Sequence, residues 1–257
     1  MANANIDIAQ PKRNPFVYLK ACPLHILTEF APRVAAMLFV FQPTERILEY
    51  PFIHENIPFD LNGRCRVLDV GSGRSLLPFE LASKGYQVWS IDFRKGYHRY
   101  IVDYDNFTSV QGDIRKTSFT DSFFDIIVAV SAIEHVGLVG RNLCPEGDKA
   151  AIQEICRILK PGGKLLITVP FGNESGVYSV GSHDSFRVYD YVHLEVLLRE
   201  FEIEVERFAV LDRRSWRPSS LAEAEAVDSL SQSRWYSSKA VAMIAARKSD
   251  VMGRGAS

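Results

Sequence analysis

A glycine-rich turn after a short apolar run is the first feature of the chain that could do chemistry. Residues 67–70, Val-Leu-Asp-Val, lead directly into Gly71, Ser72 and Gly73. A strand that ends in Gly-x-Gly lets the backbone approach a ligand closely, because no Cβ stands in the way. A helix that begins after such a turn presents unpaired N–H groups to a carboxylate or phosphate. We therefore expect a binding site for an anionic group here.

An acid follows at the spacing expected for a ribose-binding residue. Asp92 lies about 20 residues beyond Gly71, after the next apolar run at residues 87–91. A carboxylate at the end of that strand can accept hydrogen bonds from both ribose hydroxyls of a cofactor. The pair fits a dinucleotide or an adenosyl cofactor, and a tight β–α turn with an unrelated surface acid is the structural alternative.

The dinucleotide interpretation has a specific weakness in the turn. Its fingerprint requires a small residue at the sixth position, where the helix packs closely on the strand. That position is Leu76, and the third small residue is Ser75 instead. An NAD-dependent oxidoreductase therefore stays open as an alternative that the turn disfavours.

The elements that must position these residues alternate along the chain. We expect strands at 66–70, 87–91, 108–110, 124–130 and 164–169, helices at 76–82, 148–159 and 190–198, and β-like runs at 203–211 and 240–246 around a helical stretch near 219–230. Strand–helix–strand repeats build a parallel sheet. The prediction is an α/β, Rossmann-like, doubly wound and mostly parallel sheet of seven strands, the last antiparallel, with an N-terminal helical extension. Between residues 92 and 108 we expect an irregular or abbreviated helix.

Three regions are expected. Residues 1–60 are predicted to be a tail and a helical extension, since prolines divide the apolar segment 18–58 into short helices. This segment would form a lid over an open pocket or, alternatively, a packing layer. Residues 61–249 form the α/β domain, and 250–257 a disordered tail.

Composition narrows the class of protein. The chain has 30 basic and 31 acidic side chains, a balance that argues against binding to the nucleic-acid backbone. The polar first 15 residues lack a secretion signal, and the apolar run 34–41 is far shorter than the ~20 residues that cross a bilayer. Isolated cysteines indicate a reducing compartment: Cys22, Cys65, Cys144 and Cys156. We expect a soluble cytoplasmic protein that does not bind membranes.

Five ordered motifs within residues 64–172 resemble those of the class I S-adenosylmethionine (SAM)-dependent methyltransferases, particularly the small-molecule group often labelled type 11. The segment 67–73 resembles the motif that holds the amino-acid end of SAM, and Asp92 resembles the ribose acid. Residues 112–114 resemble the motif whose acid accepts from the adenine amino group, while the next residue packs on the ring. The segments 124–135 and 159–163 are similar to the fourth strand and the turn into the fifth.

The resemblance implies SAM as cofactor and residues 61–249 as the methyltransferase domain. The cofactor-binding residues it implies are Asp69, Gly71, Ser72, Gly73, Asp92, Phe93, Asp113, Ile114 and Ser131. Ser75 departs from the family's usual third glycine. The segments 131–137 and 169–172 resemble members from polysaccharide and natural-product pathways. This resemblance favours a small-molecule acceptor, with O-methylation of a hydroxyl on a sugar or natural product.

A base would be needed where the acceptor must lose a proton. His135 follows the fourth strand at the edge where α/β ligands bind, and its ordinary pKa of about 6.5 suits this role. A histidine that bonds only the local backbone is the alternative. Glu134 could orient His135 or join a metal site, but no second acid stands at metal-ligand spacing, so we predict no metal and favour a structural role. His183 is a reserve base.

Two further runs of residues are candidates for contact with the acceptor, and a non-catalytic protein is a further alternative for the function. The basic and aromatic run 94–100 and the run 182–187 could face the acceptor, although a solvated loop is the favoured interpretation of the first. A non-catalytic SAM-binding partner subunit would keep the cofactor residues without a working base. The oligomeric state is not indicated.

Overall fold

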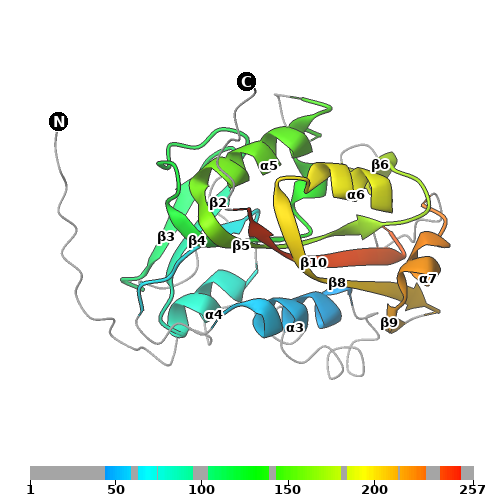
Figure 1. The fold of residues 1–257 in the computed structure, drawn as a ribbon, viewed down its shortest axis with the longest axis horizontal. Coiled ribbons are helices and arrows are strands. Elements are labelled where there is room, and N and C mark those ends of the chain that lie inside the picture. Colours follow the sequence, from blue (N-terminus) through cyan, green and yellow to red (C-terminus); the bar gives the residue numbers. More distant parts are fainter. Residues whose placement is uncertain are drawn as a thin grey trace.

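The computed structural model describes residues 44–58, 63–73, 75–94, 104–138, 143–180, 184–213, 215–229 and 238–249. They form an α/β fold in which one sheet carries helices on both faces (Figure 1). Two helices cover one face, α3 (Arg46–Asn56) and α4 (Leu77–Ser83), and two cover the other, α5 (Gly147–Ile158) and α6 (Tyr191–Leu197).

The described residues build an eight-stranded sheet with the order β3-β2-β1-β4-β5-β10-β8-β9. The strands are β1 (Arg66–Val70), β2 (Gln87–Asp92), β3 (Phe107–Gln111), β4 (Phe124–Val130), β5 (Leu159–Phe171), β8 (Phe201–Asp212), β9 (Ser215–Ser219) and β10 (Ala240–Lys248). The pairs β1–β2, β1–β4, β2–β3 and β4–β5 are parallel, and β10 runs antiparallel to both β5 and β8.

This topology confirms the doubly wound, mostly parallel sheet with an antiparallel last strand. Two elements go beyond the prediction. Strand β9 pairs antiparallel with β8 and adds an eighth strand at the edge. A separate two-stranded hairpin joins β6 (Gly176–Val180) to β7 (Asp184–Val188). The helix predicted near 219–230 is short, α7 (Leu221–Glu225), and it follows β9.

The apolar runs become central strands because helices cover both faces of the sheet. A strand buried on both sides needs apolar residues at nearly every position. Successive side chains point to opposite faces, so neighbours in β1 enter different cores. Leu68 belongs to the core that contains Ile127 and Ile155 of α5. Val67 belongs to the core that contains Phe52 of α3.

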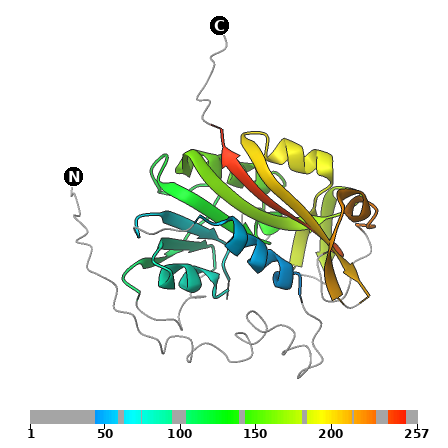
Figure 2. The ribbon, with the colours of Figure 1, turned by 60° about the horizontal axis from the view of Figure 1, so that its bottom comes forward.

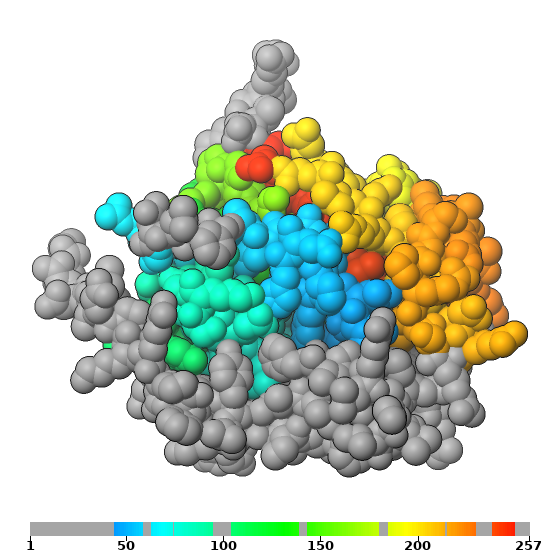
Figure 3. Space-filling model, turned by 90° about the horizontal axis from the view of Figure 1, so that it is seen from below, coloured from blue at the N-terminus to red at the C-terminus, as the bar shows by residue number. Residues whose placement is uncertain are grey.

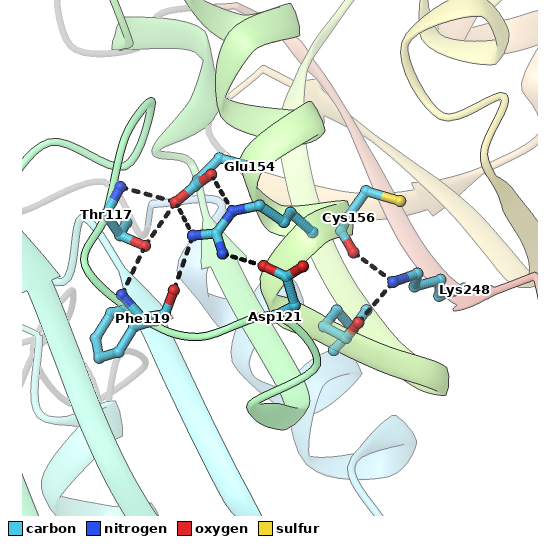
Figure 4. A network of polar contacts seen from close by, with 8 residues as sticks. Thr117, Phe119, Asp121, Glu154, Cys156 and Lys248 are labelled. Atoms are coloured by element: carbon cyan, nitrogen blue, oxygen red, sulfur yellow. Dashed lines mark hydrogen bonds and ion pairs between the residues drawn. The ribbon is translucent and has the colours of Figure 1, made fainter. Parts of the chain in front are cut away.

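Helix α5 is fixed to the loop after β3 and to β10 by polar contacts (Figure 4). The Glu154 carboxylate accepts from the backbone N–H of Thr117 at 2.7 Å and from its hydroxyl at 2.6 Å. Arg157 donates to the same carboxylate at 2.7 and 2.8 Å. Hydrogen bonds from Arg157, and then from Thr117, lower the pKa of Glu154 to about 2. Lys248 donates to the carbonyl of Cys156 at 2.6 Å, near the end of the helix.

Helix α3 lies against the same sheet face as α4 (Figure 2). Seen from below, it occupies a central position between α4 and the segment that contains β9 and α7 (Figure 3). Its Phe52 and Ile53 are buried. This part of the predicted extension therefore packs on the sheet.

Several predictions concern residues outside the described ranges. They include most of residues 1–60, most of the segment between 92 and 108, His183, and the tail 250–257. The helix predicted from Asp190 is confirmed as α6, and the Asp190 carboxylate accepts from the His193 N–H at its first turn. Within the described ranges, no helix is long and apolar enough to cross a membrane.

Candidate cofactor and active site

The predicted cofactor residues meet at one edge of the sheet. Parallel strands β1, β2, β3 and β4 all end at this edge, and ligands of open α/β sheets bind outside such carboxyl ends. Gly71 follows β1, Asp92 ends β2, Asp113 comes two residues after β3, and Ser131 follows β4. The fold therefore gathers residues that are up to 62 positions apart, at 69 to 131 of the sequence.

The turn after β1 needs its glycines. Gly71 and Gly73 have φ angles of +66° and +54°, in the left-handed region that other residues adopt at a cost. A Cβ added to Gly71 would lie 2.8 Å from the Cβ of Ala132, in the segment after β4. The hydroxyl of Ser72, which is buried, lies 2.5 Å from that of Ser90 in β2. The turn is therefore packed tightly against two neighbouring segments.

Asp92 touches this turn directly. One carboxylate oxygen accepts from the N–H of Gly73 at 3.2 Å, and the other accepts from the N–H of Arg94 at 2.8 Å. Each carboxylate oxygen has two lone pairs, so further capacity remains for ribose hydroxyls. Phe93 beside it is 48% exposed. The two features that the sequence paired by spacing are in contact.

Asp113 has a partner that the sequence analysis missed. Arg115 donates to both carboxylate oxygens, with its Nη2 at 2.6 Å from Oδ2 and its Nε at 3.0 Å from each oxygen. These hydrogen bonds lower the pKa of Asp113, so the carboxylate is held in its charged form. Ile114 and Asp69 are buried in the fold. The predicted contacts of Asp113 and Ile114 with adenine stay predictions.

His135 is oriented by a carbonyl from the β6–β7 hairpin. Its Nδ1 lies 3.0 Å from the carbonyl oxygen of Ser185. A carbonyl can only accept, so Nδ1 carries the hydrogen, and in the neutral ring the lone pair is on Nε2. The side chain is 42% exposed. The geometry therefore gives His135 the tautomer that a base acting through Nε2 requires.

Glu134 is buried beside His135. It is 1% exposed, and its Oε1 lies 3.9 Å from Nε2 of His135, beyond hydrogen-bond distance. Burial raises the pKa of Glu134 to about 8, with added repulsion from Glu49 and Glu45, against the lowering effect of Arg46. Orientation of the imidazole thus comes from Ser185, and Glu134 is largely protonated at neutral pH.

Arg187 fastens the segment that carries these two residues. Its buried guanidinium, on β7, donates to the backbone carbonyls of Val136 at 2.7 Å and Pro145 at 2.6 Å. It also forms an ion pair with Asp148 at 3.4 Å. The run 182–187 thus supports the loop after β4 through Arg187. In the described parts of the chain, no three potential metal ligands gather in one place.

Glu49 is the residue at this edge that the sequence analysis missed entirely. It lies on α3, is fully buried, and accepts hydrogen bonds from Ser131 at 2.8 Å and from Thr168 of β5 at 2.6 Å. The only local signal is an acid within an otherwise apolar helical turn, between Leu48 and Tyr50. That signal does not indicate which strands it meets.

Comparisons with known proteins agree with this geometry. The family model described as "Methyltransferase domain" matches residues 68–167. A ubiquinone biosynthesis O-methyltransferase of Xanthomonas oryzae pv. oryzae is 36% identical over 116 residues, which cover 42% of this chain and 44% of that protein. A demethylmenaquinone methyltransferase of Renibacterium salmoninarum is 27% identical over 161 residues, which cover 60% and 55%. The chain thus spans about half the length of these curated relatives.

Solved structures share the fold over more of the chain. A SAM-dependent methyltransferase from Methanosarcina mazei has a TM-score of 0.56 and 22% identity, covering 78% of this chain and 98% of that one. The 1,6-didemethyltoxoflavin-N1-methyltransferase of Burkholderia thailandensis, solved with bound 1,6-didemethyltoxoflavin and S-adenosylhomocysteine (SAH), has a TM-score of 0.54 and 16% identity, covering 95% of this chain and 94% of that one.

The match of residues 68–167 to the methyltransferase-domain model and the fold shared with the solved structures agree with each other. The resemblance drawn from the sequence motifs is confirmed.

Proposed function

We propose that the protein is a SAM-dependent methyltransferase that acts on a small-molecule acceptor. The observation that carries the proposal is the contact between Gly73 and Asp92, which joins the glycine turn to the ribose acid at the carboxyl edge of the sheet. The residues fit SAM, because the two glycines leave the backbone of the turn open to a ligand and Asp92 ends the next strand, where a ribose acid is expected.

The residues that would hold SAM are those of the turn, Asp92 with Phe93, Asp113 with Ile114, and Ser131. When bound, SAM supplies an electrophilic methyl group on an excellent leaving group. The protein's part is then to position the acceptor and to remove its proton. The N–H groups that follow the turn would face the carboxylate of SAM, and the Asp92 oxygens its ribose.

His135 is the proposed base. Its Nδ1–H donates to the Ser185 carbonyl, so Nε2 can take the proton of an acceptor hydroxyl. The buried Glu134 carboxyl lies 3.9 Å from this Nε2, beyond hydrogen-bond distance, so we assign it no part in the proton transfer. His135, which is 42% exposed, rather than the buried Glu134 would contact the acceptor.

A hydroxyl of a sugar or natural product is the proposed acceptor. A hydroxyl must lose a proton during transfer, which agrees with a histidine base, and one relative is named as an O-methyltransferase. The demethylmenaquinone and toxoflavin enzymes named above show that other acceptors occur on this fold. We further propose that residues 61–249 form the catalytic domain, that 1–60 are a tail and helical extension whose α3 packs on the sheet, and that His183 is a reserve base.

A transfer assay with methyl-labelled SAM tests the proposal. Metabolite extract is incubated with wild-type protein and with His135→Ala, and labelled products are separated and identified. We expect a labelled small molecule with wild type and a rate about 10²–10⁴-fold lower with the variant. SAH affinity should be equal for both proteins. Labelling that is equal for both proteins would refute His135 as the base. Tight SAH binding without any labelled product would favour the non-catalytic partner subunit.

A further inference from the structure

Three side chains from three separate elements form a hydrogen-bonded ring at the end of β4. The hydroxyls of Ser131 and Thr168 both donate to Oε1 of Glu49, at 2.8 and 2.6 Å. The backbone N–H of Ser131 donates to the Thr168 hydroxyl at 3.0 Å and so closes the ring. The other oxygen of Glu49 accepts from Arg46 at 2.7 Å. Glu49 is thus the shared acceptor on which the ring depends.

The ring holds a residue in an unfavourable conformation. Ser131 has a φ of +44°, in the left-handed region, which costs a residue with a Cβ about 1–2 kcal/mol. Such conformations persist where surrounding contacts over-determine them. Ser131 makes three such contacts: two from its N–H, to the carbonyl and the hydroxyl of Thr168, and one from its own hydroxyl to Glu49. Glu49 therefore helps to set the path of the chain as it leaves β4.

That path determines the space at the cofactor turn. The next residue, Ala132, places its Cβ within 2.8 Å of the position that a Cβ on Gly71 would take. A shift of Ser131 would move Ala132 into the turn or away from it. The chain leaving β4 and the glycine turn therefore form one packed unit, in which displacement of either member disturbs the other.

We propose that Glu49 is a positioning residue for the cofactor, acting through Ser131 and Ala132 on the turn at Gly71. Glu49 comes from α3, outside the matched segment 68–167, so the region before the family domain completes the wall of the cofactor site. The inference rests on the proposed function, because it takes this turn as the SAM site. It adds a determinant of affinity that no cofactor motif contains.

The test compares SAH affinity and thermal stability across four variants. Glu49→Ala removes the acceptor, Glu49→Gln keeps one oxygen for the two hydroxyls, and Thr168→Val removes the hydroxyl that links Glu49 to the Ser131 N–H. Glu204→Gln is the matched control, since Glu204 bonds Lys164 at 2.9 Å and Arg247 at 2.6 Å nearer the start of β5. Calorimetric titration gives the Kd for SAH, and circular dichroism gives the Tm and the folded content.

We expect Glu49→Ala to raise the Kd for SAH at least about tenfold, since the hydroxyls of Ser131 and Thr168 both lose their common buried acceptor. Thr168→Val should raise it as well, and Glu49→Gln should lie between wild type and Glu49→Ala. Glu204→Gln should lower the Tm and leave the Kd unchanged. If Glu49→Ala does not fold, the other two site variants decide.

Wild-type Kd values in all folded variants of Glu49 and Thr168 would overturn the inference. So would a Kd change in Glu204→Gln that matches its loss of Tm, because the effect would then follow general stability. A wild-type protein that does not bind SAH would instead refute the proposed function itself.

Discussion

Replacing Gly71 with alanine tests the packing of the cofactor turn in a way that can be worked out from the structure. The new methyl group would lie 2.8 Å from the Cβ of Ala132, where carbon atoms in contact prefer about 3.5–4.0 Å. Relieving such an overlap costs about 1–3 kcal/mol in a packed region. The φ of +66° adds about 1–2 kcal/mol for a residue with a Cβ. We therefore expect Gly71→Ala to lower the free energy of unfolding by about 2–5 kcal/mol.

Gly73→Ala is the matched control for this variant. Gly73 has a similar φ of +54°, but the nearest atom to an added Cβ is the Gly71 carbonyl oxygen at 3.9 Å, an ordinary contact. In this variant the free energy of unfolding should fall only by the backbone cost of about 1–2 kcal/mol. The difference between the two variants then isolates the overlap with Ala132.

Urea unfolding of a double-mutant cycle completes the test. Ala132→Gly removes the methyl group that Gly71→Ala would meet, so the double variant should recover about 1–3 kcal/mol beyond the sum of the single effects. The free energies come from linear extrapolation with comparable m-values. The reasoning is refuted if Gly71→Ala costs no more than Gly73→Ala, or if Ala132→Gly restores nothing.

Three further predictions concern charge. Asp92→Asn should raise the Kd for SAH about 10–100-fold in a calorimetric titration, because the carboxylate that accepts from the ribose becomes an amide with a single oxygen. An unchanged Kd would contradict the assignment of Asp92 as the ribose acid. Because the pKa of Glu154 is lowered to about 2 from 4.5, its contribution is present above pH 4.5 and is lost as the pH falls toward 2. Urea unfolding of wild type against Glu154→Gln should show a difference of at most about 3 kcal/mol at pH 7 that shrinks across that range; a constant difference would refute this origin. The pH dependence that Glu134 gives to the stability has the opposite sign, because its pKa in the folded protein is raised to about 8. Between pH 4.5 and 8 the carboxyl ionises in the unfolded chain but not in the folded one, so the free energy of unfolding falls as the pH rises. Glu134→Gln should therefore lose less stability between pH 5 and 8 than wild type, and parallel pH curves would contradict the raised pKa.

The sequence predicts the cofactor turn and its sheet well, for a local reason. The apolar run, the glycines and Asp92 lie within residues 67–92, and the order strand–helix–strand fixes which ends meet. Parallel strands then bring Asp113 and Ser131 to the same edge. The order of strands along the chain places each of these residues at the sheet edge, and that order can be predicted from a single sequence.

Tertiary contacts set the parts that the sequence does not display. Glu49 is 82 positions from Ser131 and 119 from Thr168, and no spacing links them. The tautomer of His135 depends on a carbonyl 50 positions away, in a hairpin that the pattern did not indicate.

Strand β9 shows why an edge element escapes prediction. Its five residues, Ser-Trp-Arg-Pro-Ser, include Pro218, which argues against a central strand. Proline is tolerated on an edge strand, where an N–H can face solvent. The strand forms because β8 offers a free edge to pair with, and not because of its own propensity.

The central claim is that the edge formed by Gly71, Gly73 and Asp92 binds SAM. The most direct measurement is a parallel calorimetric titration of the purified protein with SAM and with NADH. We predict saturable binding of SAM at one site per chain, lost in Asp92→Ala, and no heat of binding for NADH. Binding of NADH without any response to SAM would contradict the account and favour the oxidoreductase.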